Sequence, residues 1–129
     1  MRFKKWKPPK MKHGKFTKWK WLPLYPENII IGKNVDIGAL CFLQGKYGIE
    51  IGDNTQIGSH CSIYSENTIN ETFGHISIGK NCCIGSHTIL LPGTKIPNNC
   101  FIKANSIIQY KDNQSLEYDS KYRKREEIY

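Results

Sequence analysis

Long apolar runs are missing from this sequence of 129 residues. The longest purely aliphatic runs, Ile29–Ile31 and Ile89–Leu91, are far shorter than the ~20 apolar residues that a membrane-spanning helix needs. The first residues are charged, but no apolar segment follows them as it does in a secretory signal. These absences predict a protein with no membrane span, and we expect it in the cytoplasm.

Cysteines do not form an even set. There are five, and an odd number in a chain without an export signal favours a reducing compartment over a framework of disulfide bonds. We therefore expect the thiols to be reduced.

Acidic side chains are nearly absent from the first 27 residues. This segment has nine lysines and arginines against one acid, Glu27, which accounts for the formal net charge of +8 of the whole chain. It also holds all three tryptophans. The sequence therefore divides into a basic, aromatic arm (1–27), a neutral body (28–110) and a polar, charged tail (111–129).

A repeat of six residues organises the body. When each hexad is counted from its aliphatic residue, the first hexads of successive coils begin at Ile31, Ile51, Ile78 and Ile96. The last interval is 18 residues, or three hexads, which is one full turn of a three-sided coil. The longer intervals, 20 and 27 residues, are then a coil with an insertion, the larger near Tyr64–Gly74.

The composition of each hexad place predicts which side chains point inward. Large aliphatic residues at the first place and small ones at the fifth suit a narrow triangular core, and glycine at the second place suits a sharp bend. A period of six keeps no helical face apolar, and no hairpin turns recur in register. We predict an all-β fold, a parallel β-helix of about four coils. The small fifth-place residues are Val35, Cys41, Thr55, Cys61, Cys82, Thr88, Thr94, Cys100 and Ser106.

Residues 29–109 resemble the hexapeptide-repeat acyltransferases, whose aliphatic-Gly-x-x-small-x pattern is wound as a left-handed β-helix. The segment 84–93, IGSHTILLPG, is similar to one in galactoside and maltose acetyltransferases. The Ala-Gly-Val-Pro-like segment that ends those enzymes is absent, and the chain runs from Gln109 into the polar tail. The resemblance implies acetyl-CoA as a co-substrate and a homotrimer with shared active sites. A trimer is also attractive because so short a β-helix buries little surface alone.

Transfer of an acetyl group needs a base that takes the proton of the attacking group. His75 closes the larger insertion, and its register resembles serine acetyltransferases, in which a catalytic histidine stands three places before a coil's first aliphatic residue. We predict that His75 is the base. The alternative is that it is a polar loop residue facing water. A further histidine, His13, lies in the arm and is expected to be solvated.

Two other histidines share the fourth hexad place of successive coils. His60 and His87 should therefore stack at one corner, in a column with Leu40 and Asn105. His60 is the second candidate for the base. The residue that matches His87 in galactoside acetyltransferases is not catalytic, so we interpret His87 as a corner imidazole bonded to the backbone.

Candidate ligands of the two substrates come from the resemblance and from the insertion. The serine and alanine that touch acetyl-CoA in galactoside acetyltransferases correspond to Ser86 and Ala104. The loop 64–77 projects from the coils, and loops of this kind often bind substrates. Its polar residues Glu66, Asn67 and Asn70 are therefore the predicted acceptor ligands.

The cysteines invite a metal-site interpretation, which the repeat argues against. Four of them occupy the inward fifth place, where cysteine acts as a small buried hydrophobe. Only Cys83 falls at the sixth place and is expected to be partly exposed. We therefore predict no metal site.

The arm has three interpretations. Its aromatic residues could cover the open end of the first coil, which would otherwise expose a strand edge. Its lysines and rings could instead hold the phosphates and base of CoA or of a nucleotide-sugar. Nucleic acid uses the same groups, but we regard it as an unlikely partner.

The sequence thus predicts an acetyl-CoA-dependent acetyltransferase. The predicted acceptor is an amino or hydroxyl group of a sugar, in particular a nucleotide-linked deoxysugar such as polysaccharide biosynthesis uses, and it attacks the thioester directly. The alternative hypothesis is a non-catalytic β-helix that serves as a scaffold or binding module.

Overall fold

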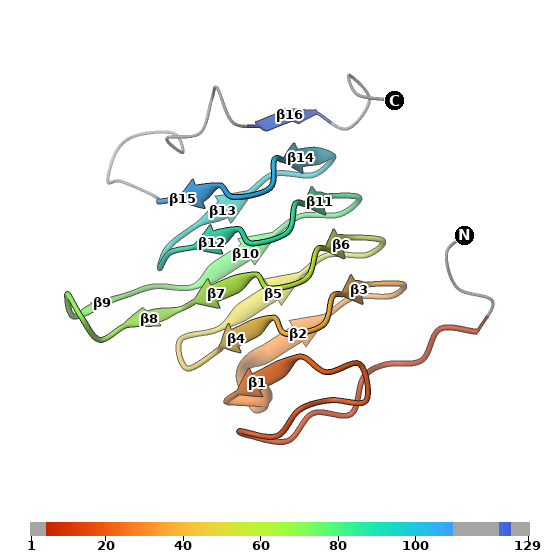
Figure 1. The fold of residues 1–129 in the computed structure, drawn as a ribbon, viewed down its shortest axis with the longest axis horizontal. Helices are drawn as coiled ribbons and strands as arrows, with labels where there is room; N and C mark the ends of the chain where they lie inside the picture. The colour runs from red at the N-terminus through yellow and green to blue at the C-terminus, as the bar shows by residue number, and fades with distance from the viewer. Residues whose placement is uncertain (1–4, 110–121, 125–129) are drawn as a thin grey trace.

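Three parallel sheets form the sides of a prism, and the chain visits each of them in turn (Figure 1). The computed structural model describes residues 5–109 and 122–124. The first sheet contains β2 (Ile29–Ile31), β5 (Ile49–Ile51), β10 (Ile76–Ile78) and β13 (Lys95–Ile96). The second contains β3 (Asp36–Ile37), β6 (Gln56–Ile57), β11 (Cys83–Ile84) and β14 (Cys100–Ile102). The third contains β1 (Leu22–Leu24), β4 (Phe42–Gln44), β7 (Ser62–Tyr64), β12 (Ile89–Leu90) and β15 (Ile107–Ile108).

Three further strands and one short helix lie outside these parallel stacks. Strand β16 (Tyr122–Lys124) pairs with β14 in the antiparallel direction, and it is the only part of the predicted tail within the described residues. Strands β8 (Glu66–Asn67) and β9 (Thr72–Phe73) form an antiparallel hairpin. The 3-10 helix η1 spans Pro26–Asn28. Among the described residues, no helix has the length and apolar character to cross a membrane.

The strand register confirms the predicted phase of the repeat. Ile51 pairs with Ile31 on one side and with Ile78 on the other, and Ile78 pairs in turn with Ile96. The four predicted coil starts therefore lie beneath one another on one side of the prism. The coil that contains the hairpin rejoins the same register, so the insertion leaves the stack undisturbed.

The first and fifth hexad places both point inward, as predicted. The first-place residues Ile63, Leu90, Ile102 and Ile108 are fully buried, and each such side chain contributes roughly 1.5–3 kcal/mol to folding. All nine small fifth-place residues are also buried.

The fifth place also supplies hydrogen-bond donors, which explains why the small residue is so often cysteine or threonine. The Cys41 thiol donates to the Gly58 carbonyl at 3.0 Å, and the Thr55 hydroxyl donates to the Gly79 carbonyl at 2.7 Å. In both cases the acceptor is a second-place carbonyl of the next coil. A buried carbonyl without a partner would cost about 1–3 kcal/mol, so the donor stabilises the corner.

The second-place glycines do not have the left-handed backbone conformation that would itself call for glycine. They are needed because the next coil passes directly over them. A Cβ on Gly38 would lie 2.5 Å from the backbone nitrogen of Ser59, and one on Gly85 would lie 2.3 Å from that of Ala104. Any side chain at these places would push the coils apart.

The left-handed backbone conformation falls at the fourth hexad place instead. Eight fourth-place residues have φ between 57° and 64°. Asparagine and histidine tolerate this region better than most residues, which accounts for seven of the eight. The exception is Leu40. The eight residues are Asn34, Leu40, Asn54, His60, Asn81, His87, Asn99 and Asn105.

The arm covers the first coil, which confirms the capping interpretation (Figure 1). Trp21 is only 2% exposed and belongs to the core. The next three residues form β1, which pairs in parallel with β4 and extends the third sheet by one strand. His13 is not simply solvated, because its Nδ1 accepts a hydrogen bond of 2.9 Å from the backbone N–H of Tyr25.

The conformation of Leu40 generates a stability prediction. Leu40 is 53% exposed, so its side chain loses little packing when replaced, whereas leucine pays about 1–2 kcal/mol in the left-handed region. The variant Leu40→Asn should therefore raise the free energy of unfolding by about 1 kcal/mol in urea denaturation. The matched reverse change is Asn54→Leu, at the fourth hexad place on another side of the next coil, and it should lower stability by a similar amount. Equal stability of all three proteins would contradict the argument.

Candidate active site

A shallow groove of about 370 Å³ runs along the outer face of the second sheet. The outward side chains of its four strands form the floor, and the second-place glycines of three coils form one edge. The residues that line it are Asp36, Gly38, Gln56, Ile57, Gly58, Cys83, Ile84, Gly85, Ser86 and Phe101.

The two predicted acetyl-CoA ligands lie on consecutive coils, and one of them lines this groove. Ser86 lines the groove, and its Oγ lies over Gly58, 2.6 Å from where a Cβ would be. Ala104 stands over Gly85 in the same way, one coil further along. The structure therefore brings Ser86 and Ala104 to the same corner of the prism, as their shared third hexad place predicted.

His60 and His87 stack at this same corner, as predicted. Their ring centroids are 4.6 Å apart and the rings are nearly parallel, with an interplanar angle of 7°. Both residues are exposed and both have the left-handed backbone of the fourth place. Parallel rings do not converge on a common point, so the pair does not form a chelate for a metal ion.

His75 lies at a different corner, where the hairpin ends and β10 begins. Its Nε2 is 3.8 Å from Oε1 of Glu50, the outward residue at the centre of β5. About half of each side chain is exposed, 48% for His75 and 53% for Glu50. The pair therefore presents an imidazole next to a carboxylate at the surface.

A glycine makes room for this imidazole. A Cβ on Gly48 would lie 2.5 Å from Nδ1 of His75, so no larger residue fits there without moving the ring. Gly48 also has φ of 101°, which other residues rarely adopt. It accepts a hydrogen bond of 3.0 Å from the backbone N–H of Ile76, which fixes the chain next to the histidine.

The larger insertion is the hairpin of β8 and β9. The residues at its start are bonded to Gln44 and Lys46 of the preceding coil. The Ser65 hydroxyl is fully buried and donates to the Gln44 carbonyl at 2.7 Å. The Gln44 amide donates to Glu66 Oε1 at 3.1 Å, while Lys46 Nζ lies 3.6 Å from Glu66 Oε2. Both carboxylate oxygens of Glu66 therefore have partners within the protein.

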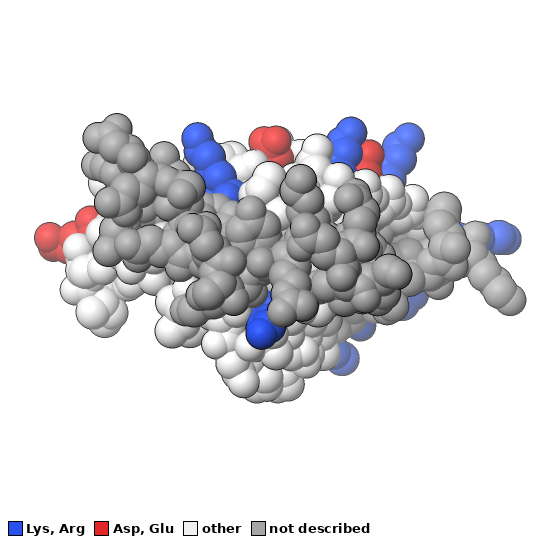
Figure 2. All heavy atoms as spheres, turned by 90° about the horizontal axis from the view of Figure 1, so that it is seen from above, with Lys and Arg blue, Asp and Glu red and all other residues white. Residues whose placement is uncertain are grey.

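The other two predicted acceptor ligands make bonds within the hairpin turn. Asn67 Oδ1 accepts from the backbone N–H of Ile69 at 3.2 Å, and Asn70 Oδ1 accepts from the Thr72 hydroxyl at 2.7 Å. These bonds shape the turn, and a role in substrate binding remains a prediction. Seen from above, carboxylates mark the end of the molecule from which the hairpin projects (Figure 2).

Two aromatic rings next to His75 form an exposed platform. Tyr47 and Phe73 stack with centroids 4.8 Å apart and an interplanar angle of 28°. They are 40% and 67% exposed. Tyr47 precedes Gly48 in the chain, and Phe73 stands two residues before His75. The platform and the imidazole therefore share one corner.

The structure thus places the predicted residues at two corners of the prism. His75 precedes the first sheet, whereas Ser86 and Ala104 follow the second, so the width of the third sheet separates them within one chain. The sequence analysis missed Glu50, Gly48 and the aromatic platform. The register could have revealed Glu50, because the hexad alignment sets it opposite Ser77.

Comparison with known proteins identifies the same six-residue repeat. The sequence model of the family described as "Hexapeptide repeat of succinyl-transferase" matches residues 28–64 and 75–110. This repeat indicates a left-handed winding of the coils. The chain is 33% identical over 93 residues to a galactoside O-acetyltransferase of Escherichia coli (strain K12), covering 65% of this chain and 46% of that protein.

A second relative is the carnitine operon protein CaiE of Proteus sp. (strain LE138). It is 30% identical over 95 residues, covering 64% of this chain and 48% of that protein. The chain thus spans about half the length of these curated relatives. No solved structure matches the chain.

Two of the buried thiols, Cys41 and Cys82, are poor candidates for chemistry. Burial raises the pKa of the Cys82 thiol, and the neighbouring Cys61 together with burial raises the pKa of Cys41. A thiol that stays protonated is neither a nucleophile nor a metal ligand. Within residues 5–109 and 122–124, no three histidine, cysteine or acidic side chains come together in an arrangement that could hold a metal ion.

The raised pKa of Cys82 predicts a pH dependence of stability. Above the ordinary thiol pKa of 9.0 the unfolded chain loses this proton while the folded protein keeps it, so stability falls as the pH rises. The variant Cys82→Thr, a residue that other fifth places accept, should lose about 1 kcal/mol less than wild type between pH 7.5 and 10 in urea denaturation. The partly exposed Cys83→Ser is the control and should behave as wild type. An unchanged pH dependence in Cys82→Thr would contradict the assignment.

Proposed function

Because the chain belongs to the hexapeptide-repeat acyltransferase family, we propose that it is an acetyltransferase that uses acetyl-CoA. The observation that carries the proposal is the His75–Glu50 pair at the base of a projecting hairpin. A structural β-helix needs neither an exposed imidazole beside a carboxylate nor a glycine that makes room for it.

The proposed base is His75, oriented by Glu50. The Glu50 carboxylate attracts the N–H of the imidazole at Nε2, which leaves Nδ1 with a free lone pair. The missing side chain of Gly48 lets the imidazole lie in this position, with Nδ1 next to the Gly48 backbone. The separation of 3.8 Å is long for a hydrogen bond, but contacts of this kind often tighten once substrate is bound.

The proposed reaction begins with proton transfer to His75. Nδ1 of His75 takes the proton of the acceptor hydroxyl or amine as its oxygen or nitrogen attacks the thioester carbonyl carbon. The carbon–sulfur bond breaks, and the CoA thiolate takes the proton back from His75. The acetyl group ends on the acceptor, and the imidazole returns to its starting state.

The acetyl-CoA is proposed to bind in the groove of the second sheet, against Ser86 and Ala104. Within one chain this groove is a full side of the prism away from His75. We therefore propose a homotrimer in which the corner with His75 of one subunit faces the groove of its neighbour. Three shared sites of this kind are the natural outcome of cyclic symmetry.

The proposed acceptor is a sugar, and the Tyr47–Phe73 platform supports this choice. Exposed aromatic rings pack well against the apolar face of a sugar ring, and this pair adjoins the proposed base. The amides of Asn67 and Asn70 lie on the same hairpin and are the proposed contacts to sugar hydroxyls. A nucleotide-linked amino- or deoxysugar is the acceptor we propose, because the basic arm suits its phosphates.

The base assignment can be tested with single variants. In an assay of thiol release with acetyl-CoA and a panel of nucleotide-linked amino- and deoxysugars, His75→Ala should lower kcat about 10²–10⁴-fold with little change in acetyl-CoA binding. Glu50→Gln should lower kcat about tenfold at an unchanged KM for acetyl-CoA, and Glu50→Asp should recover part of the loss. The matched control is His60→Ala, an exposed histidine at the other corner.

Two outcomes would count against this assignment. If His60→Ala is inactive and His75→Ala is near wild type, the base lies in the stacked pair instead. If no acceptor releases thiol and acetyl-CoA does not raise the melting temperature, as any ligand of the folded state must, the scaffold hypothesis replaces the enzyme.

The shared site can be tested by mixing two inactive subunits. Equal amounts of His75→Ala and of Ser86→Arg, which obstructs the groove, should be unfolded together and refolded. A random trimer pairs an intact base with an intact groove at about one quarter of its interfaces, so about a quarter of wild-type activity should return. Sedimentation should give three times the mass of the chain. A mixture that stays inactive, or an active monomer, would refute the shared site.

A further inference from the structure

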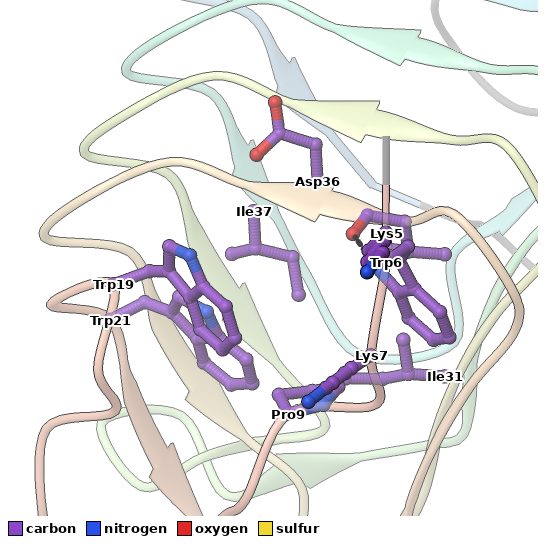
Figure 3. A pocket seen from close by; sticks show the side chains of 10 residues that line it. Lys5, Trp6, Lys7, Pro9, Trp19, Trp21, Ile31, Asp36 and Ile37 are labelled. Atoms are coloured by element: carbon purple, nitrogen blue, oxygen red, sulfur yellow. Dashed lines mark hydrogen bonds between the residues drawn. The ribbon is translucent and has the colours of Figure 1, made fainter. Parts of the chain in front are cut away.

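A second cavity, of about 170 Å³, lies between the arm and the first coil, away from His75. Figure 3 shows Trp19 and Trp21 on one side of it and Trp6 on the opposite side, with Pro9 and Lys7 below. The β-helix contributes an apolar wall from the first coil. The residues that line the cavity are Lys5, Trp6, Lys7, Pro9, Trp19, Trp21, Ile31, Val35, Asp36 and Ile37.

The walls of this cavity are held in place by the fold. Trp21 is part of the core, and the Trp6 indole donates to the backbone carbonyl of Val35 at 3.0 Å. The turn that carries Trp19 is closed by hydrogen bonds from Thr17 N–H to the Trp21 carbonyl and from Lys20 N–H to the Thr17 carbonyl. The cavity is therefore preformed, so a ligand would pay little to order it.

Capping of the first coil explains why Trp21 is buried, but it does not explain the cavity that remains beside it. A cap built only for stability would fill the end of the prism with side chains, because interiors pack densely. Here three indoles surround a hollow, and Trp19 remains 45% exposed beside it. A cavity of about 150 Å³ accommodates a benzene ring, so this one, which is open to solvent on one side, is large enough to hold a planar aromatic ring.

The charge next to this ring-sized space is positive. Lys5 and Lys7 both line the cavity and both are exposed, so their ammonium groups are available to a phosphate at its mouth. Aromatic rings with neighbouring lysines are the equipment that stacks a base and neutralises its phosphate.

We infer that this cavity binds a nucleotide, with the base between the tryptophans and the phosphate on Lys5 and Lys7. Asp36 also lines the groove of the second sheet, so the cavity and that groove adjoin. The nucleotide could therefore belong to CoA or to a nucleotide-linked sugar. The assignment of the nucleotide to CoA or to a nucleotide-linked sugar rests on the proposed function. The binding of a nucleotide by itself does not, because it needs no acetyl transfer.

Calorimetry on the full chain tests the inference without any assay of activity. The probes are adenosine 3′,5′-bisphosphate and UDP, with adenosine, uridine and inorganic pyrophosphate as partial ligands. At least one nucleotide should bind, with a Kd at least tenfold lower than that of its nucleoside and of pyrophosphate. Binding should also quench tryptophan fluorescence, since three indoles line the cavity.

Variants in the arm locate the site. Trp19→Ala removes an exposed wall without touching the core, and it should raise the Kd about 5- to 100-fold, the usual effect of losing a stacked ring. Lys7→Gln should raise the Kd and weaken its dependence on salt. The matched controls are Phe16→Ala and Lys10→Gln, an exposed aromatic residue and an exposed lysine of the same arm that do not line the cavity. Both controls should bind as wild type.

The outcomes separate this inference from the proposed function. Preference for adenosine 3′,5′-bisphosphate and competition by CoA would support the cofactor as the source, and preference for UDP would support the acceptor. If neither nucleotide binds, or Trp19→Ala binds as tightly as Phe16→Ala, the inference is wrong even if acetyl transfer is found. A single-stranded oligonucleotide that binds more than a hundredfold tighter than either nucleotide would also overturn it, in favour of nucleic acid.

Discussion

The close stacking of successive coils at their corners is the constraint on which the rest of this structure depends. Parallel strands pair at a spacing of about 4.8 Å, so each corner must pass over the one below at the same spacing. Gly38 and Gly85 meet this requirement because the backbone of the next coil occupies the space of their missing side chains. The left-handed turn is then made two residues later, at the fourth place, where asparagine and histidine are tolerated.

The same stacking decides what the corners can hold. The inward fifth place must be small, and its thiol or hydroxyl pairs with a carbonyl of the next coil, as Cys41 and Thr55 illustrate. Residues that leave the stack can do so only between strands, where an insertion does not disturb the register. The hairpin of β8 and β9 is such an insertion, and it carries the chain back to His75 in register with the coil below. A regular repeat thus positions a projecting hairpin.

A narrow prism also separates functional groups. Three flat sides keep the groove with Ser86 apart from the corner with His75, so a single chain does not bring the two proposed half-sites together. This geometry is the physical reason for the proposed trimer. The arm adds a third region at the end of the prism, where Trp6, Trp19 and Trp21 cover the first coil around a ring-sized cavity.

The sequence by itself determined the phase of the coils, the inward places and the stacking of His60 on His87. Each of these follows from counting in sixes, because a repeat with one strand per side sets residues of equal place above one another. Only the tertiary structure decided why glycine is needed at the second place and how the three tryptophans of the arm surround one cavity. These features depend on contacts between coils and on the path of a segment without a repeat, and no local pattern of residues encodes either.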